Sequence, residues 1–341
     1  MSHRTYIERL LITIGIVGLA ALLWLLSELL LLVFGAVLVA VILTALARTI
    51  TRLTRLPHRW ALVAAALGLT GLLIGGTALF GTELIAQGQQ LGDSLPRAWE
   101  SVLAYADQWG LAAQVQGALD QFGGSERIAQ QLGATAMAVG SGLTNAFLII
   151  VGGIYFAAQP KLYRTGIIKL IPEDGRGLVA TALNDSHRAL RLWLMGQLVS
   201  MTIVGVLTTL GLMLLGVPSA LALGIVAGLL EFIPYAGPIL AAIPALLLAL
   251  TVSPELALWT LLLYWGLQQI EGNLVQPLVQ QKAVDLPPAL LLFTIVAGTL
   301  LFGVLGIVFA APLTVVIFVL VKRLYVREAL HTKTELPGDT G

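Results

Sequence analysis

The residues best suited to chemistry are a carboxylate and a group of helix-breaking residues inside apolar sequence. Glu231 is followed by Pro234, Tyr235, Gly237 and Pro238, with apolar runs on both sides. An ionisable residue at membrane depth is costly and marks a functional site by default. Broken backbone persists at that depth only where protein buries it or a water-filled cavity satisfies it. We therefore expect these residues to form part of a transport pathway or of its coupling site.

Each residue of this stretch has a second interpretation. Glu231 either couples protons or cations, or it lies near the interface or caps the N-terminus of a half-helix, which is stabilising by itself. Pro234, Gly237 and Pro238 either free carbonyl oxygens for an ion, as in transporters, or make a simple turn between two short helices. Tyr235 is either a hydroxyl in a cavity or an anchor at the membrane interface.

The chain also has a dense polar patch beside an apolar run. Its members are Gln268, Gln269, Glu271, Asn273 and Gln276. Side chains three and four positions apart share one face of a helix, so Gln268 and Glu271 point the same way. We expect a gate or polar vestibule at the cytoplasmic end of the pathway. Alternatively, Glu271 pairs with Lys282 or a loop arginine and pins the end of its helix.

The sequence argues against several other kinds of chemistry. There are no cysteines, and the four histidines lie in charged loops or tails, which argues against thiolate chemistry and a histidine-ligated metal in the membrane. Ser141 lies between two glycines, but no apolar run holds a histidine that could act as its base. A glycine-rich phosphate loop is also missing. We predict no enzyme activity, no catalytic residue, no metal site and no cofactor.

Composition places these residues in a membrane protein. The chain has 341 residues, of which 58% are hydrophobic and 11% are charged, whereas a soluble domain is about 25% charged. Apolar runs of about 17–25 residues indicate spanning helices. We predict an all-α, polytopic integral membrane protein with broken or re-entrant helical hairpins and extracellular amphipathic helices.

Apolar runs and charged stretches divide the chain into successive parts. These are N-terminal membrane helices (1–80), an extracellular amphipathic helical region (81–136), a membrane helix (137–158), a cytoplasmic basic loop (159–191), a C-terminal membrane core (192–322) and a cytoplasmic tail (323–341). Within the core, 220–250 and 289–321 are predicted hairpins, because they contain apolar arms too short to span a bilayer. The amphipathic region is alternatively a solvated connector.

Basic residues predict the orientation. All of the 19 Lys and Arg residues except Arg97 and Arg127 fall on the side of the N-terminus, so the positive-inside rule puts both termini in the cytoplasm. The arginines of 48–59 and 159–191 are interpreted as topology determinants and contacts to anionic lipid of the bilayer, and not as a nucleic-acid site. The amphipathic region and the glycine-lined helix at 137–158 offer surfaces for a homo-oligomer.

Three stretches carry a resemblance to a known family. They are Gly196-Gln197 with Gly216-Val217-Pro218; Phe232-Ile233-Pro234-Tyr235-Ala236-Gly237-Pro238 with Ala242-Ile243-Pro244; and Ile270-Glu271-Gly272-Asn273 with Gln276-Pro277-Leu278-Val279, Ala297-Gly298, Phe302-Gly303, Gly306 and Ala311-Pro312. On these motifs the chain resembles the autoinducer-2 exporter family of bacterial membrane proteins, the PerM-like permeases. The resemblance covers residues 160–322 closely, and Pro287-Pro288 departs from the family's single proline.

The resemblance implies a secondary transporter of the bacterial inner membrane with about eight membrane segments. It implies export of a small polar metabolite or signalling molecule such as autoinducer-2, coupled to an ion gradient. Two alternatives stay open: a monovalent cation (Na⁺)/proton antiporter, and an oligomeric membrane scaffold that transports nothing. The scaffold predicts a closed, filled centre around Pro234, whereas a transporter predicts a polar cavity that joins Glu231 to the patch at 268–273.

Overall fold

The computed structural model describes most of the chain outside the predicted extracellular region. The described residues are 13–15, 17–19, 21–71, 75, 107, 110, 113, 144–275, 286–332 and 334. Within these ranges the regular elements are all helices and no strand occurs, so the predicted all-α class is confirmed for this part. Nearly all of the region predicted at 81–136 lies outside the described residues, as do Gln276 and Lys282.

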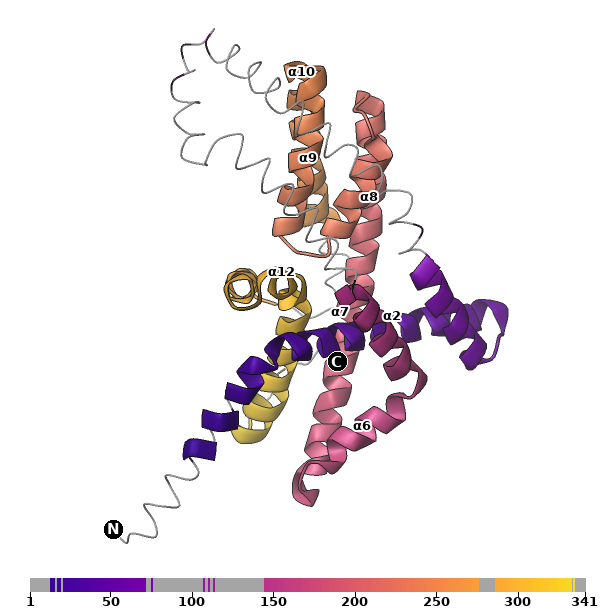
Figure 1. Ribbon diagram of the computed structural model, residues 1–341, viewed down its shortest axis with the longest axis vertical. Coiled ribbons are helices and arrows are strands. Elements are labelled where there is room, and N and C mark those ends of the chain that lie inside the picture. Colours follow the sequence, from indigo (N-terminus) through magenta and orange to yellow (C-terminus); the bar gives the residue numbers. More distant parts are fainter. Residues whose placement is uncertain are drawn as a thin grey trace.

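The helices are arranged as in Figure 1. Their bounds are α2 (Ser27–Thr54), α6 (Pro160–Lys169), α7 (Glu173–Leu215), α8 (Ala220–Leu230), α9 (Ala236–Val252), α10 (Pro254–Ile270), the π-helix η1 (Glu271–Val275), α12 (Pro288–Leu320) and the π-helix η2 (Val321–Ala329). Two further helices cover residues 58–71 and Thr144–Ala158. The long helix α7 lies at the centre, with α8, α9 and α10 beside its C-terminal half and α6 beside its N-terminal half.

Three described helical segments are long and apolar enough to cross a membrane, namely α2, α7 and the segment Pro288–Ala329. The helix Thr144–Ala158 and α6 pass the same test together, although a bend of 86° separates them. These helices make the chain a multi-pass membrane protein. Both α8 and α9 are too short to meet that test. The count of about eight segments and the depth of the hairpins stay predictions.

Helix α7 joins two parts that the sequence analysis treated separately. It runs for 43 residues, begins after Pro172 with Glu173 and Asp174 in its first turn, and ends at Gly216 in a left-handed conformation. Acidic residues stabilise a helix N-terminus, and glycine is the usual residue in such a C-cap. A helix of this length extends about 65 Å, roughly twice the thickness of the hydrocarbon. The predicted boundary at 191/192 is therefore internal to one rigid helix.

The hairpin of α8 and α9 packs against α7 through glycines. A Cβ atom added to Gly228 would lie 2.8 Å from the carbonyl oxygen of Met201 and 3.1 Å from the Cα of Gly205. A Cβ atom on Gly237 would clash with the carbonyl oxygen of Leu230. Small residues allow such close backbone approach between membrane helices. The glycines therefore determine how near the break at 231–238 lies to α7.

Helix α12 also folds back on itself. Gly303 has φ 58° and ψ −135° inside the helix, a conformation that is essentially restricted to glycine. The two arms then meet where the backbones of Gly298 and Gly306 are in contact. Farther along, the Thr314 hydroxyl donates a hydrogen bond of 3.0 Å to the hydroxyl of Thr294. The break that the sequence places at 302–303 is thus a sharp bend with packed arms.

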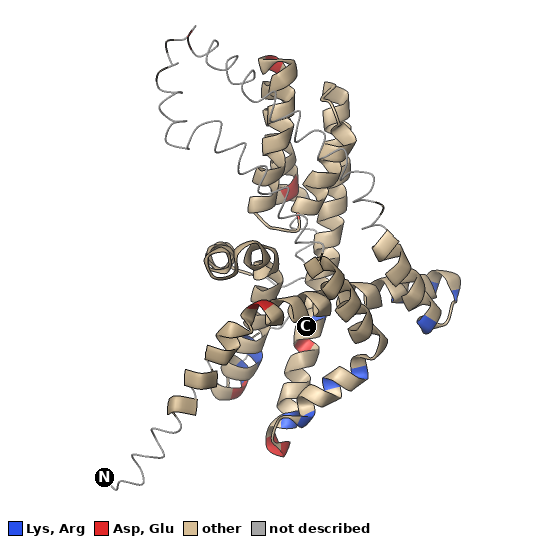
Figure 2. Cartoon of the chain, viewed as in Figure 1, with Lys and Arg blue, Asp and Glu red and all other residues tan. Residues whose placement is uncertain are grey.

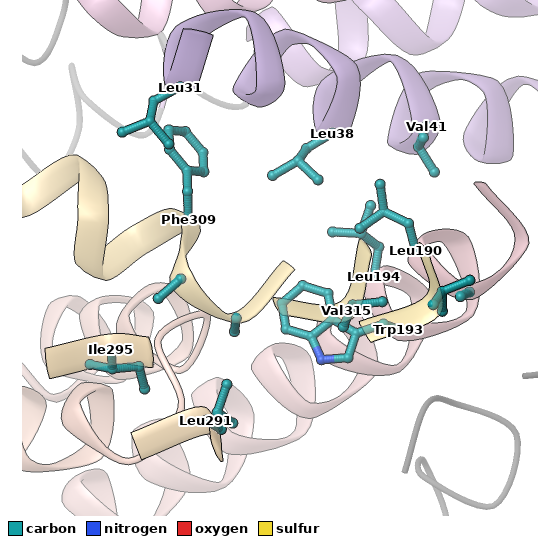
Figure 3. Packing of buried hydrophobic residues seen from close by; sticks show 14 residues of the cluster. Leu31, Leu38, Val41, Leu190, Trp193, Leu194, Leu291, Ile295, Phe309 and Val315 are labelled. Atoms are coloured by element: carbon teal, nitrogen blue, oxygen red, sulfur yellow. The ribbon is translucent and has the colours of Figure 1, made fainter. Parts of the chain in front are cut away.

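The main hydrophobic cluster holds the C-terminal hairpin against the other long helices. Figure 3 shows residues of α12, including Phe309 and Val315, packed between α2 and α7. Leu38 and Leu194 contribute from α2 and α7. A second cluster, which includes Leu212, joins the C-terminal half of α7 to α8, α9 and α10. Phe232, in the break at 231–238, packs against the first cluster, while residues of α8 and α9 on either side of the break belong to the second.

Charge is distributed unevenly over these helices. Helices α8, α9 and α10 with η1 hold three carboxylates, Glu231, Glu255 and Glu271, and no Lys or Arg. Figure 2 shows the described basic residues gathered away from these helices. The carboxylates therefore lie where no basic residue of the same helices can neutralise them.

Candidate functional site

The carboxyl groups of Glu231 and Glu271 meet inside the protein. Glu231 is the C-cap of α8 and is 3% exposed, while Glu271 opens η1 and is 6% exposed. Their side chains are within hydrogen-bonding reach of each other. Ionised carboxylates only accept hydrogen bonds, so a bond between two of them needs one proton. The geometry therefore places two carboxyl groups side by side in one buried site.

The backbone of the turn positions Glu231. Residues 231–235 leave the helical path, and Tyr235 takes a positive φ of 64°. The side-chain amide of Gln197 on α7 donates a hydrogen bond of 2.5 Å to the backbone carbonyl of Glu231. A helix end leaves such carbonyls without a helical partner, so Gln197 supplies the bond that the turn removes. Glu231 thus lies at the C-terminal end of α8. The N-cap of the next helix, α9, is Tyr235 and not Glu231.

The carboxyl pair lines a small cavity between α7, α8, α9 and α10. The lining side chains are Val204, Thr208, Ala227, Glu231, Pro238, Ala241, Tyr264, Leu267, Gln268 and Glu271. The volume open to the centre of a water molecule is about 20 Å³, which is room for about one water. This cavity joins Glu231 to the first members of the polar patch, Gln268 and Glu271.

Two hydroxyl groups of the cavity lack a hydrogen-bond partner in the described part of the chain. They are the Thr208 Oγ1 on α7, whose residue is 0% exposed, and the Tyr264 hydroxyl on α10. Buried polar groups without a protein partner are uncommon and indicate a water or an ion. Gln268 Nε2 donates to Glu271 Oε2 over 2.8 Å. The cavity therefore presents oxygen atoms from three helices, which suits a water, a proton or a small cation.

Some of the predicted site residues line the cavity, and others shape the turn beside it. Glu231, Pro238, Gln268 and Glu271 line the cavity. Pro234 and Gly237 shape the turn beside it, since the Ala236 and Gly237 amides donate to the Pro234 and Ile233 carbonyls.

Two predicted residues do not reach the cavity. Tyr235 is 41% exposed and is not among its lining residues, so the interface-anchor interpretation fits Tyr235 better. Asn273 is exposed and donates to the backbone oxygen of Gln269 over 2.9 Å. Gln276 lies outside the described residues.

Three residues of the site were missed by the sequence analysis. Tyr264 lies four positions before Gln268 and seven before Glu271. This spacing places all three on one helix face, so helical periodicity could have identified Tyr264. Thr208 carries no comparable signal, because threonine is common in apolar helices, where its hydroxyl bonds the backbone one turn earlier. Gln197 was noted as part of a motif only, and its target is a carbonyl on another helix.

The helices and this cavity define a class of protein. It is a multi-pass membrane protein with a small cavity, lined by apolar and polar side chains, at a break between short helices. Breaks of this kind are found in membrane transporters. The profile described as AI-2E family transporter matches residues 12–325. The chain belongs to this family.

The names of three similar proteins agree with this assignment. The "Putative transport protein YueF" of Bacillus subtilis is 26% identical over 304 residues, which cover 83% of this chain and 82% of that protein. The "Putative transport protein YrrI" of the same organism is 31% identical over 166 residues, 49% of this chain and 47% of the relative. The "Putative permease PerM" of Escherichia coli is 24% identical over 48% of this chain and 47% of its own length. Membrane transport is therefore the general function of the chain.

Proposed function

We propose that the protein is a secondary transporter that exports a small polar metabolite or signalling molecule of the autoinducer-2 kind, coupled to an ion gradient. The observation that carries the proposal is the contact between Glu231 and Glu271 in a cavity that also holds two unpartnered hydroxyl groups. In this proposal the carboxyl pair binds the coupling proton.

The position of the two carboxyl groups explains how a proton would act on the helices. Glu231 belongs to the turn between α8 and α9, while Glu271 belongs to the end of α10. With one proton between them the two groups bond, and without it two adjacent negative charges repel in a region of low dielectric. Loss of the proton therefore favours movement of the α8–α9 turn away from η1. A bound proton favours the closed arrangement.

The closed arrangement leaves no room for an organic substrate. Pockets for small molecules measure about 300–1,000 Å³, whereas this cavity measures about 20 Å³. In the proposed cycle, the structure is therefore the occluded state with the coupling ion site formed. A substrate site would open between the same helices when the carboxyl pair separates.

A monovalent cation/proton antiporter is the second candidate. The favouring observation is that the cavity has the size of one water or one small cation and presents hydroxyl, amide and carboxyl oxygens, which are ligands for hard cations. In that case the ion bound at the pair is itself the cargo. The scaffold alternative is disfavoured, because it has no use for buried carboxyl groups in a cavity.

We also propose that the protein lies in the bacterial inner membrane with both termini in the cytoplasm, as the positive-inside rule requires. A homo-oligomer is proposed on the amphipathic region at 81–136. The glycines of the helix Thr144–Ala158 do not add to it, because Cβ atoms on Gly152 and Gly153 would meet Ala36 and Val39 of α2 in the same chain.

The test is flux in proteoliposomes with the full-length chain, driven by an imposed pH gradient. Glu231→Gln and Glu271→Gln keep the size of each side chain and remove its titratable proton. Each is expected to lower proton-driven flux by about 100-fold, the lower range for loss of a positioned proton carrier. Glu255→Gln is the matched control, because Glu255 is exposed at the start of α10 and should leave flux unchanged.

The same vesicles separate the two candidates. Sodium-dependent proton movement without any organic solute identifies the antiporter, whereas proton movement that needs the solute identifies the exporter. Unchanged flux and unchanged pH dependence in both carboxyl variants would show that this pair is not the coupling site.

A further inference from the structure

Neighbouring side chains attach the turn between α8 and α9 to two separate packed regions. Glu231 lines the cavity between α7, α8, α9 and α10. The next residue, Phe232, packs instead against the first hydrophobic cluster, which holds residues of α2, α7 and α12. Among residues 220–275, all of which the structure describes, Phe232 alone belongs to that cluster. One step along the backbone therefore joins the carboxyl pair to a different part of the protein.

The ring of Phe232 has a defined partner. It packs edge-on against the ring of Trp193 on α7, with ring centroids 5.8 Å apart and an angle of 76° between the planes. Trp193 is 9% exposed and belongs to the same cluster, together with Phe309 and Val315 of α12 (Figure 3). Edge-to-face aromatic pairs are favourable beyond the area that they bury. The contact with Trp193 therefore gives the Phe232 ring a preferred place and orientation.

The same face of α7 holds the backbone of the turn and lines the cavity. Gln197, four residues after Trp193, donates a hydrogen bond to the backbone carbonyl of Glu231. Val204 and Thr208 follow and line the cavity. Steps of four, seven and four residues keep these four positions on one face of a helix. The turn is therefore attached to one face of α7 at two successive residues, by the carbonyl of Glu231 and by the ring of Phe232.

The packing of the helices makes Phe232 a bridge. Helix α12 packs against α7 and α2, whereas α8 and α10 pack against α7, and α9 packs against α8 and α10. In the described part of the chain, no extensive contact joins α12 to α8, α9 or α10. The carboxyl pair and the C-terminal hairpin are therefore connected there through α7 and through Phe232.

We propose that Phe232 is a positioning residue for the carboxyl pair, because its anchorage in the first cluster holds the carboxyl group of Glu231 against that of Glu271. The importance of this role for transport rests on the proposed function, whereas the geometry does not. In the proposed cycle the turn moves away from η1, and Phe232 must leave Trp193 for that movement. The aromatic contact thus opposes separation of the pair and links it to the cluster that α12 helps to build.

The experiment measures the coupling between Glu231 and Glu271 from the unfolding equilibrium of the full-length protein in mixed micelles with added SDS. Glu231→Ala, Glu271→Ala and the double variant form a cycle, and its departure from additivity is the coupling. Alanine is used because glutamine could still bond to the remaining carboxyl group. We expect a coupling of about tenfold in the unfolding equilibrium constant.

The same cycle is then repeated with the aromatic pair changed. Phe232→Leu removes the ring and keeps an apolar side chain, so it should reduce the coupling at least about threefold. Trp193→Leu removes the partner ring without altering the turn, and it should have the same effect. Because both variants delete one contact, combining them should reduce the coupling no further. Trp193→Leu also keeps the proposal testable if Phe232→Leu does not fold.

The matched control is Phe34→Leu. Phe34 packs against the same cluster from α2, where its ring meets that of Phe309. This variant should lower stability but leave the coupling between Glu231 and Glu271 within about twofold of its value in the unaltered chain. A loss of coupling equal to that in Phe232→Leu would overturn the proposal, because it would show a general loosening of the cluster.

Two further outcomes would also overturn the proposal. One is an absence of coupling between the two carboxyl groups in the unaltered chain, and the other is unchanged coupling in both Phe232→Leu and Trp193→Leu. Flux in proteoliposomes tests the proposed function separately. If the coupling depends on Phe232 while Glu231→Gln leaves flux unchanged, the positioning role stands and the transport role of the pair fails.

Discussion

The side chain of Gln197 on α7 donates a hydrogen bond of 2.5 Å to the backbone carbonyl of Glu231, at the end of α8. This bond ties the broken segment to the longest helix of the described structure. It also fixes the direction from which the Glu231 carboxyl group enters the cavity.

Gln197→Leu should destabilise the protein by about 1–3 kcal/mol, because the Glu231 carbonyl is left without its partner in a buried place. The midpoint of thermal unfolding in detergent measures the effect, and proton-driven flux should fall with it. Gln269→Leu is the control, since Gln269 is exposed on α10. Equal stability of the two variants would contradict a structural role for the Gln197 bond.

Removing the unpartnered hydroxyl groups should separate stability from function. Thr208→Val and Tyr264→Phe delete buried hydroxyls without a described partner, so unfolding midpoints should stay the same or rise. Ion-coupled flux should fall several-fold if these oxygens contact the ion. Thr260→Val is the comparison, because its equally buried hydroxyl donates to the Leu256 carbonyl over 2.8 Å. A loss of flux in Thr260→Val equal to that in Thr208→Val would argue against a specific role for the cavity.

The close packing of α7 and α8 predicts that position 228 does not tolerate a side chain larger than that of glycine. Gly228→Ala places a Cβ atom 2.8 Å from the Met201 carbonyl oxygen, so the helices must move apart, at a cost of about 1–3 kcal/mol. Thermal unfolding in detergent measures the loss. Gly266→Ala on α10 has nothing within 4 Å of the new atom and should be neutral or slightly stabilising. A neutral Gly228→Ala would mean that α7 and α8 are not in contact there.

The bend of α12 predicts that Gly303 tolerates no side chain. Its φ of 58° with ψ −135° is a conformation that costs other residues about 1–3 kcal/mol. Gly303→Ala should therefore lower the unfolding midpoint more than Gly216→Ala, whose φ of 75° and ψ of 22° are those of an ordinary left-handed cap. The reverse order would indicate that the two arms of α12 do not fold back at Gly303.

Much of the candidate site could be predicted because its signals are local. A carboxylate and two prolines between apolar runs indicate a break in the membrane whatever surrounds them. The alignment of Gln268 with Glu271 follows from helix periodicity alone. Both ends of the cavity were therefore accessible to sequence analysis before the structure was known.

What the sequence did not reveal depends on packing or on continuity of the backbone. The charged stretch before 191 and the apolar stretch after it belong to one helix, because α7 runs without a break from Glu173 to Leu215. Tyr235 is 41% exposed and is not among the residues that line the cavity, which its residue type does not reveal. Thr208 joins the site from another helix, so no local pattern could indicate it.

Composition and periodicity by themselves determined that the chain is helical, that it lies in a membrane and that its helices break at Pro234 and Gly303. These properties follow from each residue's own solvation and backbone preferences. The tertiary structure alone decided that Glu231 meets Glu271, with Thr208 and Tyr264 beside them. That meeting depends on how deeply helices interlock at Gly205 and Gly228, and such contacts between distant segments are determined only when the whole chain packs.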